Sequence, residues 1–241
     1  MSEVLSAAVV LLLAGFVYGC TGFGFGLIAV PALALVIAPD RAVPLTTFAS
    51  LPASLYLLIG VRRGVRPRLL ALLLGGAIVA TPLGAWALRS VPAEPMKAAI
   101  GILFVVLAVV FLSGWKRPLR NARAGTFAAG AAAGLLGSSA GVPGPPILLF
   151  LANQGEQKDV VRATLIAFFL CSYLLNLAAY QLAGLIDRSL GILALQTVPA
   201  ALLGSGLGLL ASKRLSERLF RRIALVLVAL SGAVLVATTL R

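Results

Sequence analysis

Residues 69–88 read LLALLLGGAIVATPLGAWAL, a run of twenty residues without a charged side chain. An α-helix rises about 1.5 Å per residue, so this run is long enough to cross the roughly 30 Å hydrocarbon core of a membrane. Comparable runs recur along the chain at 42–61, 98–114, 163–186, 189–212 and 223–240. A transmembrane β-barrel would instead show short segments of alternating hydrophobicity. The sequence therefore predicts an all-α membrane protein.

The composition agrees with this class. Of the 241 residues, 61% are hydrophobic and only 11% are charged, and the mean hydropathy is +1.07. A soluble domain of this length needs far more charged surface. The net charge of +13 comes from basic residues in short loops between apolar runs, which is the pattern of the positive-inside rule and argues against a nucleic-acid partner.

The distribution of basic residues predicts the topology. Three strongly basic loops are predicted to face the cytoplasm: 62–68, 116–123 and 213–222. Counting crossings from these loops places three further loops outside: 40–41, 89–97 and 187–188. The same count places 158–162 inside and both chain termini on the periplasmic side.

Two apolar stretches, 4–38 and 125–153, must each begin and end on the same side of the membrane. Each stretch is long enough for two helical arms with a break between them. The expected arms reach only about 13 to 25 Å, mostly short of a full crossing. We therefore favour re-entrant hairpins that enter from opposite faces, with two full crossings per hairpin as the alternative.

The two hairpins also reveal an internal repeat. Matching residues recur at an offset of 119: Gly15 with Gly134, Gly22 with Gly141, Ile28 with Ile147, and Asp40 with Asp159. Each copy is predicted to hold a re-entrant or broken helical hairpin and three transmembrane helices, an odd number of crossings. The second copy is then inverted, as in many secondary transporters. The predicted division is 1–114 for the first repeat, 115–124 for a basic cytoplasmic linker, and 125–241 for the second repeat.

The breaks carry the chemical information. The first reads TGFGFG at 21–26 and the second SSAGVPGPP at 138–146. Proline is well placed at the first position of a helix, so a new helix is predicted to begin near Pro145 and Pro146. Glycines allow backbone N–H groups to approach a ligand, and a helix N-terminus attracts anions. Together these features predict a small-anion site.

Many other glycines have a simpler interpretation as packing positions. Their spacing suits close contact between helices, and this interpretation is favoured for Gly15, Gly19, Gly130, Gly134, Gly204 and Gly208.

The sequence resembles the sulfite exporter TauE/SafE family. The resemblance rests on Gly22–Gly26 with the following LIAVP, its echo half a chain later, the basic loops, and the run AVPLTT at 42–47. Pro143 and Pro145 stand where glycines are common in that family. The resemblance implies a multi-pass protein of the inner (cytoplasmic) membrane. It also implies a secondary transporter, not an enzyme, that moves sulfite, sulfonates or other small anions. An anion channel and a non-transporting scaffold subunit are the alternatives.

The predicted substrate-binding residues are those of the two breaks and the polar residues of the following spans. They are Thr21, Gly22, Phe23, Gly24, Phe25, Gly26, Thr46, Thr47, Ser50, Ser138, Ser139, Gly141, Val142, Pro143, Gly144, Pro145, Tyr173 and Asn176.

No metal site and no cofactor are predicted. The chain has no histidine, and its seven acidic residues all lie near predicted loops. A proton relay or cation site normally places a carboxylate within a span, so no single carboxylate is expected to be the obligatory proton carrier. The expected partners are a small anionic substrate and the lipid bilayer, and a homo-oligomer is left open.

Overall fold

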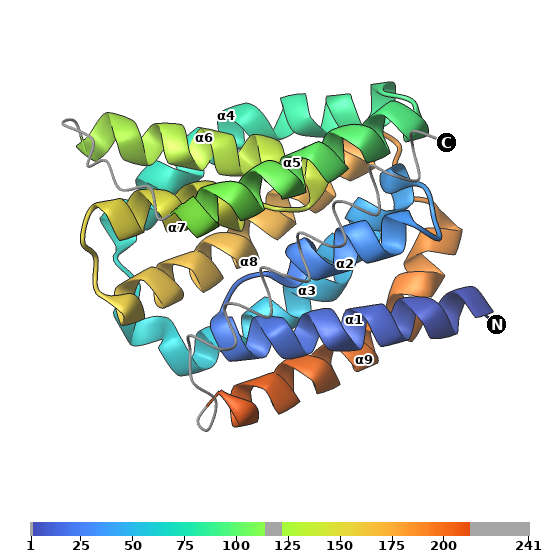
Figure 1. The fold of residues 1–241 in the computed structure, drawn as a ribbon, viewed down its shortest axis with the longest axis horizontal. Helices are drawn as coiled ribbons and strands as arrows, with labels where there is room; N and C mark the ends of the chain where they lie inside the picture. The colour runs from blue at the N-terminus through green and yellow to red at the C-terminus, as the bar shows by residue number, and fades with distance from the viewer. Residues whose placement is uncertain (1, 114–121, 213–241) are drawn as a thin grey trace.

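The computed structural model describes residues 2–113 and 122–212, which form helices without any strand (Figure 1). By length and composition, five of the described helical segments can cross a membrane: α1, α3 with η1, α4, α8 and α9. The predicted all-α membrane class is therefore confirmed. The bounds are α1 Ser2–Thr21, α2 Phe25–Ala34, α3 Pro39–Val61, η1 Arg62–Gly64, α4 Pro67–Ser90, α5 Ala93–Ser113, α6 Ala122–Ala140, α7 Gly144–Asn153, α8 Lys158–Leu182 and α9 Arg188–Ala211.

Several helices extend beyond the predicted apolar runs. Helix α3 begins at Pro39 and α8 at Lys158, so Asp40 and Asp159 lie in first helical turns and not in loops. An acidic residue in the first turn is favoured by the helix dipole, which explains these extensions. Helix α6 begins at Ala122, within the segment predicted as linker. The remainder of that linker, the basic loop 213–222 and the run 223–240 lie outside the described residues.

The hairpins differ from the predicted pair of short arms. Helices α1 and α2 run in opposite directions, as do α6 and α7 (Figure 1). The first arms are long, with 20 residues in α1 and 19 in α6, or about 30 Å each. The second arms, α2 and α7, have 10 residues each. The prediction of arms shorter than a full crossing was thus wrong for α1, which is long enough to span.

The glycines within α1 are packing positions and not helix breaks. A β-carbon on Gly19 would lie 2.1 Å from the carbonyl oxygen of Ser205, and one on Gly204 would lie 2.0 Å from that of Leu12. These glycines bring the backbones of α1 and α9 into direct contact. They do not break the helix. The favoured packing interpretation is therefore confirmed for them.

Helices α4 and α6 pack in the same manner. A β-carbon on Gly76 would lie 2.1 Å from the Phe127 carbonyl oxygen, and one on Gly130 would lie 2.0 Å from that of Leu73. The α1–α9 and α4–α6 pairs form two sides of the molecule, and α3 contacts α8 between them (Figure 1). Close approach through small residues is a common way for membrane helices to associate.

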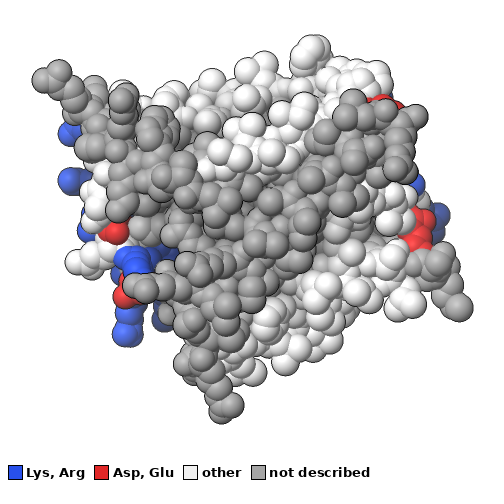
Figure 2. Space-filling model, viewed as in Figure 1, with Lys and Arg blue, Asp and Glu red and all other residues white. Residues whose placement is uncertain are grey.

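The loops group at two ends of the helix bundle. At one end, Arg66 forms an ion pair with Glu156 at 2.7 Å. At the other end, Arg89 donates hydrogen bonds to the carbonyl oxygens of Ala183 and Gly184. On the face shown in Figure 2, the described charged side chains gather at these two ends. The grouping agrees with the predicted topology.

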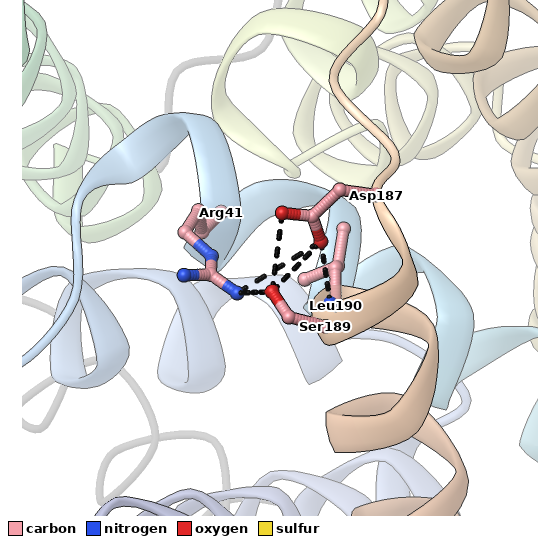
Figure 3. Close-up of polar contacts among 4 residues, drawn as sticks. All are labelled: Arg41, Asp187, Ser189 and Leu190. Carbon is pink, nitrogen blue, oxygen red and sulfur yellow. Dashed lines mark hydrogen bonds and ion pairs between the residues drawn. The ribbon is translucent and has the colours of Figure 1, made fainter.

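A polar cluster joins α3 to the start of α9 at the second end (Figure 3). The Asp187 carboxylate accepts a hydrogen bond from the Leu190 N–H at 2.6 Å and lies 4.0 Å from the Arg41 guanidinium. Arg41 also donates to the Ser189 hydroxyl. The Leu190 N–H and then the Ser189 hydroxyl hold the pKa of Asp187 below its ordinary value of 3.8. The cluster caps the N-terminus of α9.

Candidate functional site

The first break is a tight turn between α1 and α2. Gly22 and Gly24 have φ angles of 77° and 95°, a left-handed region that favours glycine. The Gly22 N–H donates to the Tyr18 carbonyl oxygen at 2.7 Å, and the Phe23 N–H donates to the Thr21 hydroxyl at 3.2 Å. Substitution of either glycine would therefore strain the turn.

The second break is built on a matching glycine. Gly141 follows α6 with a φ of 67°, and its N–H donates to the Gly137 carbonyl oxygen at 3.1 Å. Helix α7 then begins at Gly144, with Pro145 and Pro146 in its first turn, which confirms the predicted helix start. Gly22 and Gly141, paired by the sequence repeat, thus take the same conformation directly after the long arm of each hairpin.

The two breaks touch each other. A β-carbon on Gly26 would lie 1.8 Å from the Gly141 carbonyl oxygen, and one on Gly144 would lie 4.0 Å from the Phe23 β-carbon. A side chain at Gly26 would meet rigid backbone, so it would force the breaks apart. The close contact depends on glycine at this position.

A small pocket lies where the breaks meet. Its cavity volume is about 10 Å³, enough for about one water molecule. A sulfite-sized anion is larger, so it would enter only if the walls separated. None of the lining side chains is charged. The lining residues are Phe23, Gly24, Phe25, Gly26, Leu27, Gly141, Val142, Pro143, Gly144, Pro145, Phe169 and Tyr173.

The structure brings ten of the predicted site residues to this pocket and leaves eight outside its lining. Those outside are Thr21, Gly22, Thr46, Thr47, Ser50, Ser138, Ser139 and Asn176. Several of their hydroxyls already donate to the carbonyl oxygen four residues earlier, as Thr46 does to Ala42 at 2.8 Å and Ser138 to Gly134 at 2.8 Å. Because these hydrogens are engaged, such hydroxyls are poorly placed to donate to an anion.

Two lining residues were not predicted from the sequence, Leu27 and Phe169. The rings of Phe169 and Tyr173 stack at 5.9 Å, and Tyr18 packs against Phe25 with centroids 5.9 Å apart. Phe169 could have been predicted from the sequence, because it lies four residues before Tyr173 and therefore on the same helix face. An aromatic wall therefore encloses one side of the pocket.

Unpartnered polar atoms concentrate on α8. Of the seven buried side-chain nitrogen and oxygen atoms without a partner in the described residues, five belong to this helix. They are the Arg162 Nε, the Thr164 and Ser172 hydroxyl oxygens, and both amide atoms of Asn176. A buried polar group without a partner lowers the stability of the fold by about 1–3 kcal/mol. Such groups are therefore candidates for binding a ligand or a water molecule.

Asn176 lies behind the pocket wall. It is fully buried, and its Nδ2 is 3.6 Å from the β-carbon position of Gly137. The same position is 3.0 Å from the β-carbon of Pro143, which lines the pocket. Asn176 also follows pocket-lining Tyr173 by three residues, on the same helix face. The Asn176 amide and pocket-lining Pro143 therefore both lie next to Gly137.

The backbone donors of the site come mainly from the first break. Helix α2 begins at the pocket, and its N-cap Gly24 offers no side-chain cap. The first N–H groups of a helix have no intrahelical acceptor and carry partial positive charge. In α7, Pro145 and Pro146 occupy the first turn and have no N–H. The site thus has one uncapped helix N-terminus, an aromatic wall and no acidic side chain, which suits a small anion.

Comparison with known proteins gives one match. The family model described as sulfite exporter TauE/SafE matches residues 7–235. No curated protein and no solved structure matches the chain. The matched region includes both breaks and every residue that lines the pocket.

Proposed function

The chain belongs to the sulfite exporter TauE/SafE family, a family of multi-pass membrane transporters, and on that premise we propose that it is a secondary transporter of small sulfur-containing or organic anions. Sulfite and sulfonates are the proposed substrates, and the cytoplasmic membrane is the proposed location. The observation that carries this proposal is the pocket between the two breaks, because an uncapped helix N-terminus opens there among uncharged walls.

The proposed binding site holds the anion by backbone and amide groups. The first N–H groups of α2, at Phe25 and Gly26, would donate to the anion oxygens. The Asn176 amide would add a side-chain donor and gain the partner that it lacks. Phe169 and Tyr173 would shield the complex from water and so strengthen these hydrogen bonds.

Transport would require the two breaks to separate. A cavity of about 10 Å³ holds no anion of this size, so the anion would enter only when the walls move apart. Separation of α2 from the second break would widen the pocket toward one end of the bundle at a time.

An inverted repeat would provide this motion. We propose that residues 1–114 and 125–241 are the two copies, joined by 115–124. Two observations support this. Gly22 and Gly141 share a left-handed conformation, and each long arm packs against the fourth α-helix of the other copy, α1 against α9 and α6 against α4. Rocking of inverted copies around a fixed site is a known route to alternating access.

No side-chain carboxylate is proposed to carry a proton. Asp40 and Asp159 lie in the first turns of their helices, and Asp187 precedes α9 at one end of the bundle. None of the three lines the pocket. Any proton that accompanies transport would then travel on the substrate as a protonated anion.

Two measurements on purified protein test the proposal. A thermal-shift panel of sulfite, thiosulfate, sulfoacetate, taurine and lactate would identify the ligand, and uptake of that ligand into proteoliposomes would establish transport. Saturable uptake that is accelerated by unlabelled substrate inside the vesicles is expected. Uptake without saturation would favour a channel, whereas no uptake of any compound, with a co-purifying partner, would favour a scaffold subunit.

A further inference from the structure

Arg162 extends from the start of α8 to the first break. Its Cγ and Nε lie 2.8 and 3.2 Å from the β-carbon position of Gly22, and its Nη2 donates to the Gly19 carbonyl oxygen at 3.2 Å. The guanidinium therefore lies against the backbone of the turn, directly before pocket-lining Phe23. The sequence placed Arg162 in a loop and gave it no role.

Arg162 lacks the carboxylate partner that Arg41 and Arg66 have among the described residues. Arg41 lies beside the Asp187 carboxylate, and Arg66 pairs with Glu156. No carboxylate of the described residues forms an ion pair with Arg162. Its Nε is buried and has no acceptor in the part of the chain that the structure describes. A partly buried guanidinium with an unused donor is well suited to bind an oxyanion.

Arg162 lies between the pocket and one end of the helix bundle. Arg162 belongs to the end where the β-carbon position of Gly64 lies 3.2 Å from the Asp159 carbonyl oxygen and where Arg66 meets Glu156. Gly22 separates its guanidinium from the pocket wall. The guanidinium thus lies between the basic start of α8 and the turn that leads to pocket-lining Phe23.

We propose that Arg162 is a substrate-binding residue at the mouth of the pocket on this basic end. It selects for substrates with a net negative charge, because its charge attracts sulfite or sulfoacetate and repels the ammonium group of taurine. This inference rests on the proposed transport function. Neighbouring Gly22 supports it, because a side chain there would displace the guanidinium.

A purely structural role predicts a different behaviour. The bond from Arg162 to Gly19 caps the last carbonyl groups of α1, which by itself stabilises a helix C-terminus. Loss of such a cap would lower the stability of the protein and the amount of active protein. It would not change the KM for the anion or the preference between anionic and zwitterionic substrates.

The test compares Arg162→Gln and Arg162→Lys with Arg63→Gln, which removes a charge from an exposed side chain at the same end. Uptake of radiolabelled sulfite into proteoliposomes gives KM and Vmax, and taurine serves as competitor. We expect Arg162→Gln to raise KM at least about tenfold, the scale of one lost charge-assisted hydrogen bond, and to let taurine compete better. Arg162→Lys should restore most of the discrimination against taurine, and Arg63→Gln should match the wild type.

The outcomes separate this inference from the function on which it rests. If the wild type takes up sulfite and folded Arg162→Gln has the KM and taurine sensitivity of Arg63→Gln, the inference is overturned and the transporter assignment stands. If Arg162→Gln does not fold, Arg162→Met, which keeps an aliphatic stem without the charge, is measured in its place. A raised KM and better competition by taurine in Arg162→Met support the inference, and the KM and taurine sensitivity of Arg63→Gln overturn it. A wild type that transports no anion overturns both.

Discussion

Replacement of Asn176 by leucine separates function from stability. The Asn176 side chain is fully buried, and neither of its amide atoms has a hydrogen-bond partner among the described residues. Leucine has the same branched shape and no polar atoms, so Asn176→Leu removes a penalty of about 1–3 kcal/mol for a buried unpaired group. We therefore expect the thermal stability of the unliganded protein to stay the same or to rise.

The same change should weaken anion binding. A hydrogen bond to a charged group contributes about 1.5–3 kcal/mol, which corresponds to roughly 10- to 150-fold in Kd or KM. Thermal unfolding in detergent and sulfite uptake in proteoliposomes measure the two effects. The control is Thr197→Val, which removes a buried hydroxyl that already donates to the Leu193 carbonyl oxygen. Wild-type affinity in Asn176→Leu, or stability well below that of the control, would refute the reasoning.

Three further predictions follow from the geometry. Gly26→Ala should lower transport at least about tenfold, because the added β-carbon forces the breaks apart. Gly60→Ala, with open space around it, is the control and should leave uptake unchanged and stability within about 1 kcal/mol. Equal uptake by the two variants would contradict the importance of the contact between Gly26 and Gly141. Replacing Asp40, Asp159 or Asp187 singly by Asn should keep uptake within about fivefold of wild type, and abolished uptake in a folded variant would show an obligatory carboxylate. Because the pKa of Asp187 is lowered on folding, its contribution to stability should be complete above its ordinary pKa and disappear as the pH falls through the lower folded value. Acid unfolding of Asp187→Asn compared with wild type measures this.

The membrane class and the two breaks could be predicted from the sequence because they depend on local properties. Uninterrupted apolar runs require a membrane, and Gly22 and Gly141 mark turns that need left-handed backbone. Pro145 and Pro146 likewise indicated a helix start. The lengths of the hairpin arms could not be predicted in this way, because Gly19 is tolerated in α1 only through its contact with the Ser205 backbone.

The side chains around the site were harder to predict because polarity alone does not reveal hydrogen-bond partners. Thr46 and Asn176 are both polar residues within spans and were both predicted as ligands. The Thr46 hydroxyl donates to its own helix, whereas the Asn176 amide has no partner within residues 2–113 and 122–212. Arg162 was assigned to a loop because it follows two charged residues. Its side chain reaches Gly22 because α8 packs against α3, an arrangement that local sequence does not reveal.

A reversible cross-link between the two breaks tests the central claim most directly. The β-carbon of Phe23 lies 4.0 Å from the β-carbon position of Gly144, within the range of about 3.5–4.5 Å found in disulfides. The variant Phe23→Cys/Gly144→Cys is made with Cys20→Ser and Cys171→Ser, and sulfite uptake is measured before and after reduction. We expect oxidation to abolish uptake, because the breaks cannot separate, and reduction to restore it. Equal uptake in the fully cross-linked and the reduced protein would contradict a transport site between the two breaks.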